Sequence, residues 1–138
     1  MSFSRGALER RLSRVEREIE RRDQLLPDGF LRLKKIANKG PVHFCQEALG
    51  FKPFDYQIEF LNDALQYQFI VLIWCRQSGK SHIVAAFLFW AAVEYDGFQY
   101  GVIGPSFRQS KLIIRKINAF VQKLPKDIPP RDVWAGGK

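Results

Sequence analysis

Residues 74–81 of the 138-residue chain read Trp-Cys-Arg-Gln-Ser-Gly-Lys-Ser and carry the clearest chemical signal. In the phosphate-binding pattern GxxxxGK[ST], backbone N–H groups surround phosphates at the start of a helix. The lysine reaches the β- and γ-phosphates, and the hydroxyl is a magnesium ligand. Gly79, Lys80 and Ser81 fill the last three positions of the pattern, whereas Trp74 replaces the first glycine. We therefore expect a nucleotide-binding loop here, with Ser81 as the Mg²⁺ ligand.

The replaced glycine predicts that the chain is still extended at Trp74 and that the tight curl is confined to 75–79. Arg76 lies inside that curl, where its guanidinium could stabilise charge that develops on a γ-phosphate. The alternative is an arginine that faces outward and pairs with an acid. Arg76 and Lys80 are the catalytic candidates, and the expected nucleotide-binding residues of the loop are Arg76, Gln77, Ser78, Gly79, Lys80 and Ser81.

The segments around the loop predict an α/β fold. Residues 69–74, Phe-Ile-Val-Leu-Ile-Trp, form a continuous apolar run that is typical of a strand buried on both faces, and 98–104 resemble a second such strand. Helices are expected at 42–49, 54–65, 81–95 and 105–124, the last with Ser106 as its N-cap. Strand, helix, strand and helix with short links predict parallel strands joined by a right-handed crossover. The expectation is a partial P-loop NTPase fold, a parallel sheet flanked by helices.

Composition divides the chain into three parts. Residues 1–29 predict a charged amphipathic helix with a short coiled-coil-like seam, 30–41 a basic linker that ends in Gly40-Pro41, and 42–138 the N-terminal part of a P-loop ATPase domain. Residues 125–138 contain three prolines and predict no regular element. The apolar positions of the seam are Leu8, Leu12, Val15, Ile19 and Leu26.

The charge balance is strongly basic, with 22 Lys and Arg against 14 Asp and Glu, a net charge of +8. This excess favours nucleic acid, another polyanion or an anionic membrane surface as partner, although solubility alone also explains it. The candidate DNA contacts are basic positions of the 105–124 helix, and the same pattern is typical of any solvated helix face. They are Arg108, Lys111, Arg115 and Lys116.

Neither the two cysteines, Cys45 and Cys75, nor the two histidines, His43 and His82, have the spacing of metal ligands, so we expect no metal centre in them. We expect both cysteines to be buried free thiols, and a disulfide between them is the alternative. The start of the sequence does not resemble a signal peptide, and the apolar run 83–93 is too short to span a bilayer. We expect a soluble protein of the cytoplasm, without membrane association.

Three motifs together resemble the ATPase domain of large terminase subunits, the motors that package the DNA of tailed viruses. They are the Arg-Gln-x-Gly-Lys-Ser loop, the upstream Pro-Phe-Asp-Tyr-Gln-Ile-Glu-Phe-Leu and the downstream Gly-Pro-Ser-Phe-Arg-Gln-Ser. In that family the phosphate loop often lacks its first glycine and carries an arginine. The resemblance covers roughly residues 42–124. Superfamily-two helicases share the same layout and are the nearest alternative.

The resemblance implies ATP and Mg²⁺ as cofactors, with Gln57 reading the adenine edge and Tyr56 beside it. Ser106 and Gln109 match the family's segment after the second strand and are candidate nucleotide or coupling contacts. The implied partners are double-stranded DNA, a small terminase subunit or portal-type protein, and further copies of the chain. In a virus, the place of action would be the host cytoplasm.

The sequence after Lys80 lacks the four apolar residues followed by Asp-Glu that a P-loop motor uses to hold magnesium and activate water. The family's coupling segment and nuclease domain also have no counterpart. We therefore expect ATP binding without useful hydrolysis in this chain alone, as a fragment of a longer motor, a truncated gene product or a small protein that reuses half the fold. The alternative from another class is a non-enzymatic basic module that binds DNA or a subunit and keeps a relic loop.

Overall fold

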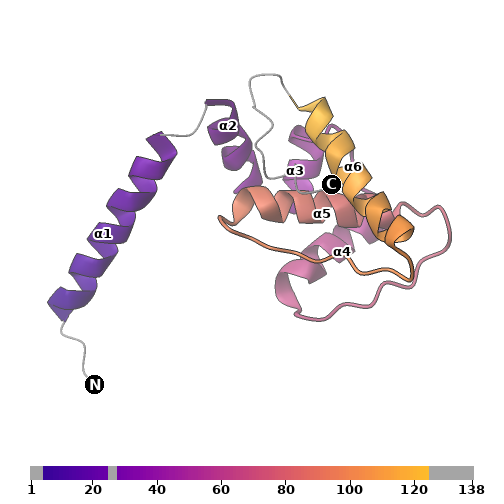
Figure 1. The fold of residues 1–138 in the computed structure, drawn as a ribbon, viewed down its shortest axis with the longest axis horizontal. Coiled ribbons are helices and arrows are strands. Elements are labelled where there is room, and N and C mark those ends of the chain that lie inside the picture. Colours follow the sequence, from indigo (N-terminus) through magenta and orange to yellow (C-terminus); the bar gives the residue numbers. More distant parts are fainter. Residues whose placement is uncertain (1–4, 25–27, 125–138) are drawn as a thin grey trace.

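The computed structural model describes residues 5–24 and 28–124, and all regular elements in these ranges are α-helices (Figure 1). Helices α3 to α6 agree within a few residues with those expected from sequence. The helices are α1 (Arg5–Gln24), α2 (Asp28–Ala37), α3 (Pro41–Glu47), α4 (Asp55–Gln66), α5 (Lys80–Glu94) and α6 (Phe107–Lys123).

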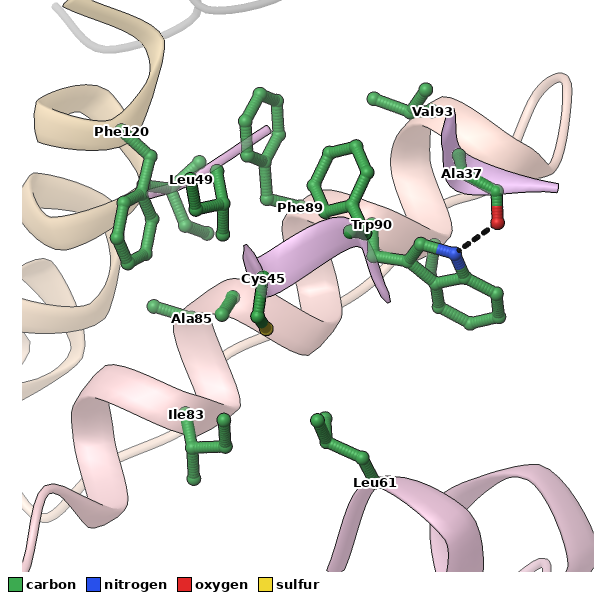
Figure 2. Packing of buried hydrophobic residues seen from close by; sticks show 14 of the residues in the cluster. Ala37, Cys45, Leu49, Leu61, Ile83, Ala85, Phe89, Trp90, Val93 and Phe120 are labelled. Atoms are coloured by element: carbon green, nitrogen blue, oxygen red, sulfur yellow. Dashed lines mark hydrogen bonds between the residues drawn. The ribbon is translucent and has the colours of Figure 1, made fainter. Parts of the chain in front are cut away.

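Helix α5 is the centre of the core. It is apolar almost all round, as its sequence predicts, and α2, α3, α4 and α6 all pack against it. Figure 2 shows the packed side chains, among them the Trp90 indole, whose Nε1 donates a hydrogen bond of 2.9 Å to the Ala37 carbonyl of α2. The Gly-Lys-Ser motif therefore forms the N-terminus of the helix that has the most buried residues among the described elements.

The N-terminal part differs from the rest in exposure. Figure 1 shows α1 standing away from the other helices, and the seam residues Leu12 and Val15 are 54% and 55% exposed. Helix α2 occupies most of the stretch described as a linker from sequence, and it buries Leu33 and Ala37 in the core. Two parts of the sequence prediction lie outside the described residues. They are Leu26, at the end of the expected seam, and the stretch 125–138, for which no regular element was expected.

The prediction of a parallel sheet is wrong for the described residues, which contain no strand. Segments 69–74 and 98–104 connect helices instead, and neither makes the backbone hydrogen bonds of a sheet. Without a sheet there is no right-handed crossover and no P-loop NTPase fold in the described part of the chain. The arrangement is helical throughout.

The side chains of the first segment explain this error. Leu72 and Trp74 are partly buried against the helical core, whereas Phe69, Val71 and Ile73 are 87%, 83% and 89% exposed. Ile103 of the second segment is likewise 98% exposed. Alternate residues of the apolar runs thus pack on the helices, and the others are exposed to solvent. The sequence had predicted strands buried on both faces.

None of the described helices combines the length and the apolar character that a membrane span requires.

Candidate phosphate-binding site

The loop between Trp74 and α5 is closed by its own side chains. The Lys80 ammonium donates a hydrogen bond of 3.2 Å to the Trp74 carbonyl, and the Ser78 hydroxyl donates one of 2.9 Å to the Cys75 carbonyl. Two residues adopt the left-handed conformation that this tight path requires: Gln77 at φ 61° and Gly79, the N-cap of α5, at φ 77°. The result is a compact curl over 75–79, as the sequence predicts.

Helix α4 holds both ends of this loop. At the start of the loop, the Trp74 ring packs edge-on against two rings of α4. Its centroid lies 5.0 Å from that of Tyr56 and 6.1 Å from that of Phe60. At the end of the loop, the Ser78 carbonyl accepts hydrogen bonds from the Tyr56 hydroxyl at 2.9 Å and from Gln57 Nε2 at 3.3 Å. The bulky residue at the position of the first glycine is therefore an anchor for the loop.

Gln57 is buried, with only 4% of its surface exposed. Its Oε1 accepts a hydrogen bond of 3.1 Å from the Phe54 amide, and its Nε2 lies so close to Gly79 that a Cβ there would be 2.7 Å away. The amide group thus joins the start of α4 to the loop. Reading of adenine by Gln57 stays a prediction, and it requires the amide to leave these partners.

The loop surrounds a pocket of about 320 Å³ at the N-terminus of α5. All six loop residues predicted to bind nucleotide line it, together with three residues that the prediction of the nucleotide site did not include. The lining residues are Cys75, Arg76, Gln77, Ser78, Gly79, Lys80, Ser81, His82 and Lys116. Backbone N–H groups at a helix N-terminus and the cations around them favour an anion.

The remaining predicted site residues lie elsewhere. Tyr56 and Gln57 support the loop from α4 without lining the pocket, and Ser106 caps α6 by accepting a hydrogen bond of 3.4 Å from the Gln109 amide. Lys111 lies over the Phe107 ring at 4.3 Å. Three of the four candidate DNA contacts are exposed on α6, namely Arg108, Lys111 and Arg115, whereas Lys116 is half-buried at the pocket.

His82 sits between aromatic rings, with centroids 4.7 Å from Phe51 and 4.9 Å from Phe120. Burial lowers the pKa of its imidazole, and the positive charges of Lys116 and Lys123 lower it further. His82 is therefore neutral at pH 7, and the positive charge of the pocket comes from arginine and lysine side chains.

The two cysteines differ, contrary to the expectation that both are buried. Both are free thiols, but Cys75 is exposed beside the pocket and only Cys45 lies in the core. Burial raises the pKa of the Cys45 thiol to about 12, so it stays protonated.

The donor set fits phosphate better than it fits an isolated metal ion. No carboxylate lines the pocket, and the described residues contain no group of three or more His, Cys, Asp or Glu that could hold a metal. The Ser81 hydroxyl at the pocket could serve Mg²⁺ only where phosphate oxygens supply further ligands, since Mg²⁺ is commonly bound through substrate phosphates and waters.

Comparison of the chain with protein-family models, with curated proteins and with solved structures finds no match.

Proposed function

We propose that the loop 75–81 binds the phosphates of ATP and that the chain is the ATP-binding portion of a terminase-like DNA-packaging motor. The observation that carries this proposal is the pocket at the start of α5, which the whole Gly-Lys-Ser loop lines and to which the described residues bring no carboxylate. The motor assignment rests on the three sequence motifs, because the described fold is helical. Mg²⁺ would accompany ATP, with Ser81 as its protein ligand.

Each part of the loop has a task in this proposal. The N–H groups at the start of α5 would donate hydrogen bonds to phosphate oxygens, and the Lys80 ammonium would exchange the neutral Trp74 carbonyl for a charged phosphate. Arg76 adds a second cation from the exposed side of the curl. Because no carboxylate of the described residues lines the pocket to activate water, we propose that the described site holds ATP without hydrolysing it.

Replacement of Lys80 by alanine is the direct test. A charge-assisted hydrogen bond contributes roughly 1.5–3 kcal/mol, so Lys80→Ala should weaken ATP binding about tenfold to a hundredfold. Isothermal titration of the full chain with ATP, with and without Mg²⁺ at fixed ionic strength, measures this loss. Lys111→Ala removes the same charge outside the pocket and should leave the affinity within about twofold, because exposed charges at a distance are screened. Equal affinities of the wild type and Lys80→Ala would exclude the proposed site.

A further inference from the structure

Lys116 is a pocket residue that comes from a different element than the loop. It belongs to α6, thirty-six positions after Lys80, and among the described residues it is the one lining residue outside 75–82. The sequence grouped it with three exposed basic residues of the same helix. The structure separates it from them, because Lys116 is half-buried at the pocket while the other three face outward.

The packing of α6 on α5 fixes this lysine near the loop. Ile117, the next residue, is fully buried, and Phe120, one turn later, contacts both His82 at 4.9 Å and Phe51 at 6.1 Å. Both Lys116 and His82 line the pocket, and the charge of Lys116 adds to the effect of burial in lowering the pKa of His82. Lys116 therefore lies near the N-terminus of α5 because Ile117 and Phe120, which follow it on α6, are packed in the core.

The charges of the pocket favour a ligand with several negative charges. Arg76, Lys80 and Lys116 all line it, and none of them makes an ion pair with a carboxylate of the described residues. Its volume of about 320 Å³ corresponds to roughly ten water molecules, which is more than a single phosphate group with four oxygens needs. One phosphate bound at the start of α5 would leave the cation from α6 without a partner.

We propose that Lys116 is a second phosphate-binding lysine, and that it makes the pocket selective for a chain of two or more phosphates over a single phosphate. This inference rests on the proposed phosphate site at the loop. The first phosphate binds the N–H groups of α5 and Lys80, and the following phosphate reaches Lys116. The recognised chemistry is the polyphosphate chain, which a nucleotide and an inorganic polyphosphate share.

Four proteins and three ligands test the proposal: the wild type, Lys116→Gln, Lys116→Arg and Lys111→Gln, each titrated with ATP, AMP and inorganic tripolyphosphate at one ionic strength. Lys116→Gln should weaken ATP and tripolyphosphate about tenfold, as expected for one lost charge-assisted contact, and AMP less than about twofold. Lys116→Arg keeps the charge and should stay within about threefold of the wild type. Lys111→Gln removes the same charge from the same helix outside the pocket and should bind like the wild type.

Several results would overturn the inference. These are an unchanged ratio of ATP to AMP affinity in Lys116→Gln, an equal loss in Lys111→Gln, or binding of ATP but not of tripolyphosphate by the wild type. If Lys116→Gln binds ATP with wild-type affinity while Lys80→Ala binds it more weakly, the role of Lys116 is rejected and the proposed function stands. Binding of ATP that is indifferent to Lys80→Ala would reject the proposed function itself. Far-ultraviolet circular dichroism confirms the fold of each variant, and Lys116→Ala, which also removes the charge and should show the same loss for ATP and tripolyphosphate, replaces the glutamine variant if that variant is unfolded.

Discussion

At the scale of single residues, the candidate site depends on a few contacts that position the loop. The loop residues could be read from the sequence because they are contiguous and each has a chemical reason for its place. Gln57 could not be read in this way, since its burial comes from the loop folding onto α4. Lys116 was also missed as a pocket residue, because only the packing of α6 on α5 brings it to the loop.

Gly79 is the residue at which the loop tolerates a side chain least. Its φ of +77° disfavours any L-residue, and a Cβ would lie 2.7 Å from Gln57 Nε2. We expect Gly79→Ala to lower the free energy of unfolding by about 2 kcal/mol, of which roughly half is the backbone strain. It should also weaken ATP binding, because Gln57 must release the Ser78 carbonyl. Urea unfolding and titration with ATP measure the two effects.

Gly97→Ala is the matched control for this prediction. Gly97 has almost the same φ, +74°, but a Cβ there meets nothing within 4 Å, so only the strain of about 1 kcal/mol remains. Because Gln57→Ala removes the same hydrogen bond to the Ser78 carbonyl, Gly79→Ala/Gln57→Ala should bind ATP no more tightly than Gly79→Ala. Equal destabilisation by both single glycine substitutions would show that the approach of Gln57 contributes nothing.

At the scale of elements, local patterns predicted the helices and non-local contacts decided the rest. The amphipathic repeat of 107–123 and its Ser106 cap are local signals, and α6 forms as expected. A strand needs hydrogen-bonding partners from distant residues, which an apolar run does not specify. Segment 69–74 is such a run, and it covers helices with Leu72 and Trp74 instead of joining a sheet.

The hydrogen bond between Trp90 and Ala37 joins two helices inside the core. Trp90→Phe removes this donor and part of the ring from a site that is 4% exposed, so we expect the free energy of unfolding to fall by about 1–2 kcal/mol. The Ala37 carbonyl keeps its bond from the Gly40 amide, which limits the loss. Urea unfolding followed by circular dichroism measures the change.

Trp74→Phe makes the same chemical change at a half-buried tryptophan whose indole N–H has no hydrogen-bond partner among the described residues. It should destabilise the protein by less than Trp90→Phe. If the two variants unfold at the same urea concentration, the link between α5 and α2 does not contribute to stability.

At the scale of the whole molecule, a basic body carries an exposed apolar strip, which we define as Phe69, Val71 and Ile73. The net charge of +8 keeps molecules apart at low ionic strength, whereas adjoining exposed apolar side chains favour association. These two properties act on different length scales. Salt screens the charge repulsion but does not weaken the apolar attraction.

We therefore expect association of the protein to increase with salt. Sedimentation velocity at about 0.05 M and about 1 M NaCl should show a shift toward larger species, because the Debye length falls from over 10 Å to about 3 Å. Val71→Lys should suppress the shift. Leu65→Lys places the same charge at another exposed apolar position, on α4, and should suppress it less. Association that is insensitive to Val71→Lys would exclude the strip as its cause.

The hydrogen bond from Lys80 to the Trp74 carbonyl has a consequence for any affinity measured at this site. The carbonyl accepts a hydrogen bond from the ammonium, keeps it oriented and competes with phosphate for it. Phosphate binding is then an exchange reaction, and the observed dissociation constant contains the free energy of breaking the internal contact. A change in the backbone path at Trp74 would move the carbonyl that competes with phosphate for the Lys80 ammonium. It would thus alter the affinity for phosphate although no phosphate-binding residue is changed.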